Sequence, residues 1–97
     1  MNSNKKFHTV RGYEILKKHK NLLTNSMEDY LEMIYRNSLE CGYTRINEIS
    51  KSLNIRPSSA TKMVQKLSEI GFVNYEKYGI IKLTKKGEDM GSFLLKR

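Results

Sequence analysis

Apolar residues recur every three or four positions in several stretches of the chain, and each stretch ends at a residue that stops a helix. The first stretch predicts a helix that Ser26 caps and that ends before Gly42. A shorter helix follows, with Asn47 as its expected cap and Asn54 at its end. The apolar face of the first helix consists of Met27, Tyr30, Leu31, Ile34, Tyr35 and Leu39, and that of the second consists of Ile46, Ile49 and Leu53.

Pro57 marks the start of a third helix, because proline is tolerated in the first helical turn and disfavours helical backbone in the residue before it. Gly71 supplies the stop. We expect this helix to lie on a core by its apolar face and to expose the opposite one. The apolar face comprises Ala60, Met63, Val64, Leu67 and Ile70.

Two runs of β-branched and aromatic residues, 72–76 and 80–84, flank a three-residue turn and predict a β-hairpin. A fourth helix follows Thr84, and its Gly87 and Gly91 lie on one face, which favours close packing against another helix. The order of elements is therefore helix, short helix, tight turn, helix, hairpin and helix. This order predicts a mainly α winged helix-turn-helix with a small β-hairpin wing.

The chain has 97 residues and a formal net charge of +8, which suits one small domain with an anionic partner. We divide it into a basic extension over 1–25, with six basic residues against one acid, and a winged domain over 26–97. No run approaches the ~18 apolar residues that a membrane span needs, so no membrane partner is expected. The single Cys41 cannot form an internal disulfide, which favours the reducing cytoplasm.

Within the winged domain, the basic excess is concentrated in residues 45–86, which hold nine basic and three acidic residues. Such a surface attracts a polyanion, and Lys and Arg contacts to phosphates position a protein on duplex DNA without reading its sequence. The candidates for phosphate contact are Arg45, Lys51, Arg56, Lys66, Lys77, Lys82, Lys85 and Lys86.

The outer face of the third helix carries uncharged hydrogen-bonding side chains and one cation, which can bond base edges in the major groove. The alternative is an ordinary solvated helix face, and the scarcity of acids there argues against it. A winged-helix module that binds another protein is the next interpretation. The candidates for base contact are Ser58, Ser59, Thr61, Lys62 and Gln65.

An enzyme is the least favoured class. The chain shows no nucleophile–base arrangement, no phosphate-binding glycine loop and no complete set of metal ligands, so we expect no small-molecule substrate. One cysteine and two histidines also exclude a self-contained zinc site with the usual four ligands.

Four stretches of the chain resemble the N-terminal domain of the diphtheria-toxin-repressor family, and most of all its manganese-responsive branch. They are SMEDYLEMIY (26–35), GYTRINEISKSLNI (42–55), RPSSATKMVQKL (56–67) and YEKYGIIKLTKKG (75–87). The resemblance implies a homodimeric, divalent-metal-dependent repressor that binds double-stranded operator DNA upstream of metal-uptake genes. It also implies that residues 57–67 form the recognition helix and that the hairpin tip, with Lys77 and Tyr78, is a DNA-contacting wing.

The same resemblance places two of the family's metal ligands on Asp29 and Glu32, which lie one helical turn apart. Aspartate at the first position is typical of the manganese branch, so the implied cofactor is Mn²⁺, with Fe²⁺ as the alternative. The family's other ligands and most of its dimer interface follow the winged domain and are absent from this chain, so we expect the chain alone to bind the metal weakly or not at all and to dimerise weakly. From the residues alone, the ordinary interpretation of two acids in a first turn is that they complement the helix dipole.

Two other functions stay open at this point. One is a winged-helix regulator that binds DNA without a metal. The other is a truncated interaction partner that forms inactive mixed dimers with a full-length repressor.

Overall fold

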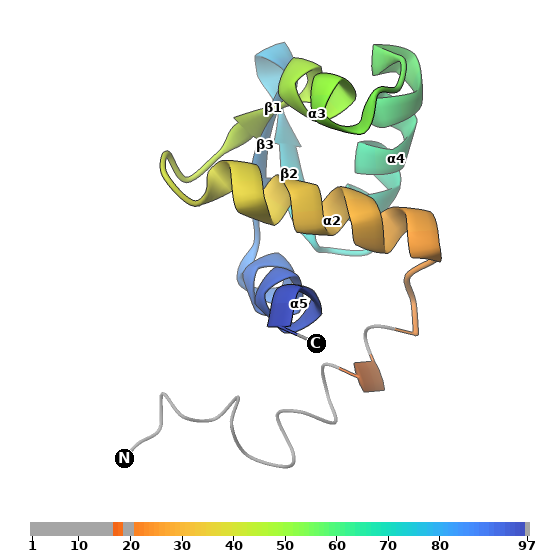
Figure 1. The fold of residues 1–97 in the computed structure, drawn as a ribbon, viewed down its shortest axis with the longest axis vertical. Helices are drawn as coiled ribbons and strands as arrows, with labels where there is room; N and C mark the ends of the chain where they lie inside the picture. The colour runs from red at the N-terminus through yellow and green to blue at the C-terminus, as the bar shows by residue number, and fades with distance from the viewer. Residues whose placement is uncertain (1–16, 19–20, 97) are drawn as a thin grey trace.

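The fold was determined as a computed structural model, which describes residues 17–18 and 21–96. Its elements are α2 (Asn25–Ser38), β1 (Thr44–Arg45), α3 (Ile46–Leu53), α4 (Pro57–Glu69), β2 (Val73–Glu76), the 3₁₀ turn η2 (Lys77–Gly79), β3 (Ile80–Leu83) and α5 (Lys85–Lys96). α2 crosses the middle of the molecule, with α3 and the hairpin tip at one end and α5 at the other (Figure 1). The predicted winged helix-turn-helix is confirmed. Most of the predicted basic extension lies outside the described residues.

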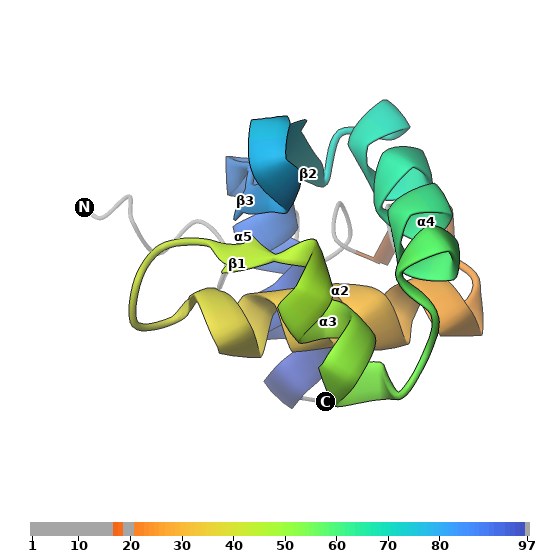
Figure 2. The ribbon, with the colours of Figure 1, turned by 90° about the horizontal axis from the view of Figure 1, so that it is seen from above.

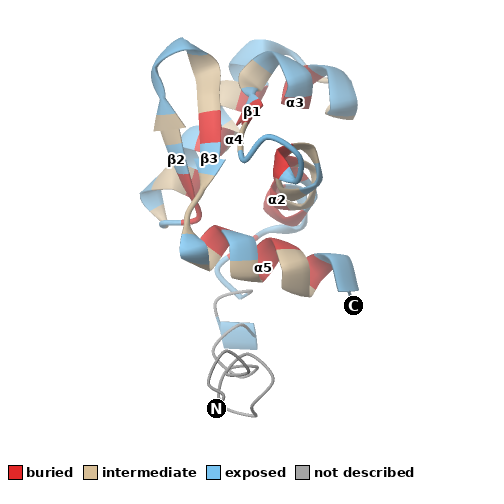
Figure 3. Ribbon diagram, turned by 90° about the vertical axis from the view of Figure 1, so that its left-hand side faces the viewer, coloured by how far each residue is buried: buried red, intermediate tan, exposed pale blue. Residues whose placement is uncertain are grey.

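The core is built from the apolar faces that the spacing predicts. Leu31 and Ile34 of α2, Val64 of α4 and Met90 of α5 are fully buried, together with Phe72 before β2. Figure 3 shows buried positions recurring along the helices and strands, with exposed positions between them. The first predicted stripe extends one residue too far. Leu39 is 63% exposed, because it caps the carboxyl end of α2 instead of lying on its inner face.

Two predicted helix starts are wrong. α2 is capped by Thr24, whose hydroxyl accepts a hydrogen bond from the backbone N–H of Met27 at 3.1 Å, so the helix begins before Ser26. α3 is preceded by Arg45 and begins at Ile46, ahead of the predicted cap Asn47. In both places several polar residues precede the apolar stripe. The sequence pattern does not show which of them is the N-cap, the last residue before the backbone becomes helical.

The hairpin belongs to a three-stranded sheet in the order β1-β3-β2, and the short strand β1 was not predicted. All pairs are antiparallel, with Thr44 opposite Ile81 and Glu76 opposite Ile80. Thr44 is fully buried and donates its hydroxyl hydrogen bond to Glu48 of α3 at 2.7 Å. The sheet thus ties the wing to the first helix of the helix-turn-helix.

α5 packs along α2 as its glycine spacing predicts. A Cβ added at Gly91 would lie 2.8 Å from the Tyr35 side chain of α2, so glycine is needed for this close approach. The other glycine meets the sheet instead, because a Cβ at Gly87 would lie 1.9 Å from the carbonyl oxygen of Phe72. Across the described part of the chain, no helix is long and apolar enough to cross a membrane.

Candidate nucleic-acid interface

The turn between α3 and α4 is held by hydrogen bonds that fix one helix relative to the other. Asn54 ends α3 in the left-handed conformation with φ 55°. The backbone N–H of Ile55 then donates to the carbonyl of Ser50 at 3.0 Å, and the buried Ser50 hydroxyl donates to the carbonyl of Ile55 at 2.5 Å. These two hydrogen bonds join Ser50 in α3 to Ile55 in the turn. They hold the turn in one conformation and thereby fix the direction of α4 relative to α3.

The start of α4 can receive an anion. Pro57 occupies its first turn, Arg56 precedes it with extended backbone, and no acidic residue lies in that turn. The free N–H groups and the positive end of the helix dipole are therefore not neutralised by the helix's own side chains. A DNA phosphate is an anion of the kind that such an end attracts.

The outer face of α4 carries the predicted base-contacting side chains, which project from the face opposite the buried Ala60, Val64 and Leu67. Four of the five are exposed and Thr61 is half-buried. The structure therefore brings these side chains to one accessible surface beside the anion-attracting end of the helix. The exposed four are Ser58, Ser59, Lys62 and Gln65.

The hairpin tip lies on the same side of the molecule as α3 and α4 (Figure 2). Tyr78 at the tip is 87% exposed and adopts φ 65°, a left-handed conformation that residues with a side chain rarely use. Gly79 follows with φ 75°, and a Cβ there would lie 3.0 Å from Ile46 at the start of α3. The tip is thus packed against α3 while its tyrosine projects outward.

The cations around this surface fall into two groups. Of the described cations on or beside α3, α4 and the hairpin tip, six form no ion pair: Arg45, Lys51, Arg56, Lys62, Lys66 and Lys77. The other candidates are engaged within the protein. Lys82 pairs with Glu76 at 3.8 Å, and Lys85 pairs with Asp89 at 3.4 Å. Lys86 is half-buried and donates to the carbonyl of Ile70 at 2.8 Å, so its ammonium is directed to the carboxyl end of α4.

The two predicted metal ligands lie near the middle of α2. Asp29 is exposed and Glu32 is half-buried, and the intervening Tyr30 faces the core, where burial raises the pKa of its phenol. In the described part of the chain, no group of three His, Cys, Asp or Glu residues is placed to hold a metal ion. Manganese favours about six oxygen-type ligands, so these two carboxylates are at most part of a site.

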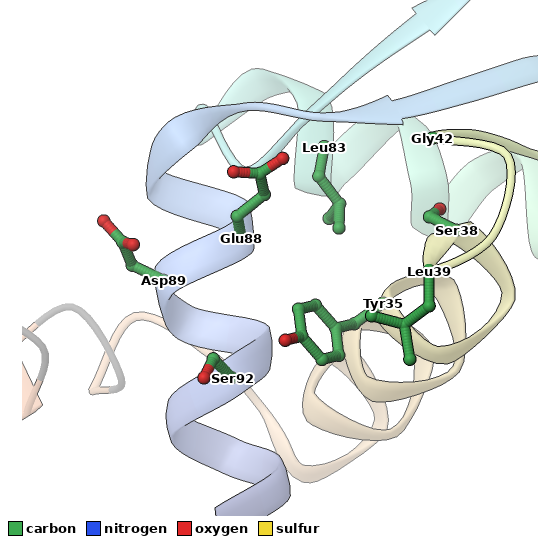
Figure 4. A pocket seen from close by; sticks show the side chains of 8 residues that line it. All are labelled: Tyr35, Ser38, Leu39, Gly42, Leu83, Glu88, Asp89 and Ser92. Atoms are coloured by element: carbon green, nitrogen blue, oxygen red, sulfur yellow. The ribbon is translucent and has the colours of Figure 1, made fainter.

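A cleft of about 420 Å³ lies between the carboxyl end of α2 and α5 (Figure 4). The Ser38 hydroxyl is buried there without a hydrogen-bond partner among the described residues. The carboxylate of Asp89 points away from Tyr35, and Glu88 is directed towards Leu83. The polar groups around this cleft therefore do not converge on one point. Its lining residues are Tyr35, Ser38, Leu39, Gly42, Leu83, Glu88, Asp89 and Ser92.

The family described as "Iron dependent repressor, N-terminal DNA binding domain" matches residues 22–81, which include the whole helix-turn-helix and the hairpin tip. This chain belongs to that family. The matched residues include α4 and its exposed face, and the family is described as a DNA-binding domain. The DNA-binding interpretation is therefore favoured over a protein-interaction module.

One curated relative and two solved structures are similar to this chain to different degrees. The HTH-type transcriptional regulator MntR of Lysinibacillus sphaericus is 49% identical over 74 residues, which are 76% of this chain and 53% of the relative. The crystal structure of the IdeR protein of T. acidophilum has a TM-score of 0.58 at 31% identity, covering 67% of this chain and 30% of that one. The multiple antibiotic-resistance repressor MarR of Listeria monocytogenes shares the fold alone, with a TM-score of 0.63 at 22% identity over 99% of this chain and 74% of that one.

The chain spans about half the length of the curated relatives that it matches. The aligned half contains the helix-turn-helix. Relatives with this name are transcriptional regulators, which are not enzymes.

Proposed function

We propose that this chain is the DNA-reading part of a metal-dependent transcriptional repressor that acts in the cytoplasm as a homodimer. The observation that carries the proposal is the outer face of α4, where Lys62 and Gln65 are exposed beside a helix start without acids. Membership of the iron-dependent repressor family supports it. The partner would be a double-stranded operator, and the dimer would place two copies of α4 in successive major grooves.

Each part of the surface has its own role in this proposal. Lys62 and Gln65 would bond base edges, because amide and cationic side chains match the donor and acceptor pattern of the major groove. Arg56 and Lys66 would contact phosphates on either side, while Arg45 and Lys77 would hold the backbone nearer the wing. Ser58, Ser59 and Thr61 would complete the contact at the amino end of α4.

The preferred duplex can be found by selecting from a random DNA pool with this chain, and its affinity is then compared with that of a scrambled duplex. We expect Lys62→Ala and Gln65→Ala each to lower the affinity for the preferred duplex by roughly 10- to 100-fold, as one lost base contact costs about 1–3 kcal/mol. Lys96→Ala is the matched control, since it removes an exposed charge from the far end of α5. Unchanged discrimination in both α4 variants would refute the recognition-helix assignment.

We further propose that Asp29 and Glu32 supply two carboxylate ligands to the regulatory metal, with Mn²⁺ favoured over Fe²⁺. The support is their shared side of α2 and the MntR name of a relative at 49% identity. When bound, the ion would supply a charge that neutralises the two carboxylates and fixes the first turns of α2. The rest of its ligands would come from other residues of the full repressor.

Paramagnetic broadening tests this metal assignment directly. Added MnCl₂ should weaken the amide NMR signals around Asp29 and Glu32 before those of α4, because broadening falls off steeply with distance from the ion. The double variant Asp29→Asn and Glu32→Gln should lose that selective broadening. Equal broadening of the unchanged chain and the double variant would contradict the assignment.

A further inference from the structure

The first turn of α5 grips the carboxyl end of α4. The Thr84 hydroxyl donates to the carbonyl of Gly71 at 2.7 Å and caps α5 by accepting from the N–H of Gly87 at 3.0 Å. Lys86 lies beside this cap, and its ammonium donates to the carbonyl of Ile70 at 2.8 Å. Ile70 is the residue that ends α4, so a cation satisfies a carbonyl at the negative end of the helix dipole.

The Lys86 ammonium is also held over an aromatic ring. It lies 4.6 Å from the centroid of the Phe72 ring, and Phe72 is fully buried at the start of the sheet. Because the ammonium contacts both a carbonyl oxygen and the face of a ring, the Lys86 side chain is held in one orientation. Its neighbour Lys85 differs, because its side chain is 77% exposed and pairs with Asp89 on the surface.

The location of Lys86 argues against contact with DNA. α4 runs from the end that carries the hairpin tip towards α5 (Figure 1). Lys86 meets α4 at the far end of that helix, away from Ser58 and Ser59. It therefore touches the reading helix without lying on the reading surface.

We propose that Lys86 is a positioning residue for the recognition helix, setting the direction of α4 by holding its carboxyl end against α5 and Phe72. This inference rests on the proposed function, because it assigns Lys86 an effect on DNA discrimination. A small tilt at the carboxyl end displaces the side chains of Lys62 and Gln65 relative to base edges. Phosphate contacts tolerate such a displacement better, since they are less directional.

Three variants separate positioning from the alternatives. Lys86→Met keeps the aliphatic stem against Phe72 and removes the donor and the charge. Lys86→Arg keeps both and is the conservative rescue, because guanidinium donates to carbonyls and stacks on rings. Lys85→Met is the matched control, as it removes an equal charge one residue away.

We expect Lys86→Met to lower the ratio of affinities for the preferred and scrambled duplexes by roughly three- to tenfold. Lys85→Met and Lys86→Arg should leave that ratio within about twofold of the unchanged chain. The slope of log affinity against log salt concentration should be the same in all four proteins. A lost phosphate contact would instead reduce that slope by about 0.9 and weaken both duplexes equally, which would overturn the proposal.

Amide NMR shifts of the free proteins supply a readout that does not depend on DNA. Lys86→Met should shift amides along α4 as far as Lys62, and Lys86→Arg should restore them. Shifts confined to 70–72 with unchanged discrimination, even at a lowered Tm, would show a purely structural cap and overturn the proposal. If the unchanged chain prefers no duplex, the proposed function fails, while the α4 shifts still decide whether Lys86 positions the helix.

Affinities are compared at a temperature where circular dichroism shows each variant folded. If Lys86→Met does not fold, Lys86→Gln replaces it, because the shorter neutral amide removes the charge over the Phe72 ring and reaches less far towards the carbonyl of Ile70. The same two outcomes then decide the proposal.

Discussion

At the scale of single residues, Tyr78 has an exposed side chain and an unfavourable, left-handed backbone conformation. A non-glycine residue in the left-handed region costs roughly 1–2 kcal/mol, and its ring gains no burial in return because it is 87% exposed. Such local strain is typical of residues that serve a contact outside the protein. The tip is also cationic, since Lys77 is exposed beside it. We therefore propose that Tyr78 serves a contact with operator DNA instead of stabilising the fold.

Tyr78→Gly should leave the free energy of unfolding unchanged or raise it by up to about 1 kcal/mol, because relief of the left-handed strain offsets the greater freedom of glycine in the unfolded chain. The affinity for the preferred duplex should fall. Tyr75→Gly is the control, since Tyr75 is half-buried against the core in β2 and its loss should cost stability. Urea unfolding measures both, and a marked loss of stability at Tyr78 would contradict this assignment.

At the scale of elements, the sequence predicts the four helices and the hairpin, because each has a recognisable apolar pattern and the first three helices end at or before Gly42, Asn54 and Gly71. It does not predict β1, because two residues are too few to show a strand pattern. The sequence also does not predict the position of the Lys86 side chain. A lysine in the first turn of a helix gives the same sequence pattern whether its side chain extends into solvent or packs against the protein. The α4 reading face follows from periodicity, whereas the grip on its carboxyl end depends on residues 16 positions apart.

The junction between α5 and the sheet depends on Gly87. At a solvent-exposed position inside a helix, replacing glycine with alanine stabilises the helix by about 1 kcal/mol. Here the added Cβ would lie 1.9 Å from a backbone oxygen of Phe72, so Gly87→Ala should destabilise the protein by about 1–3 kcal/mol or more. Gly42→Ala is the comparison, because nothing lies within 4 Å of its Cβ and only its φ of 84° is unfavourable. Thermal unfolding should show the larger loss at Gly87, and equal losses would contradict the close contact.

At the scale of the whole molecule, the cations differ between the end formed by α3 and the hairpin tip and the end formed by α5 (Figure 1). Six of the described cations without an ion pair lie on or beside α3, α4 and the hairpin tip, whereas on α5 Lys85 pairs with Asp89 at the surface and Lys86 is bonded to the carbonyl of Ile70. With about four to six phosphates contacted, the slope of log affinity against log salt concentration should be about −4 to −5 for one chain. A slope near zero in a salt titration would show that these cations do not meet DNA.

Amide NMR mapping of the labelled chain with its preferred duplex tests the central claim most directly, because it locates the DNA on the protein. We predict that the largest shifts fall at Ser58, Lys62 and Gln65 of α4 and at Tyr78, with α5 and the cleft beside Tyr35 little changed. Shifts centred on that cleft and on α5, with α4 unaffected, would contradict the claim that α4 is the reading helix.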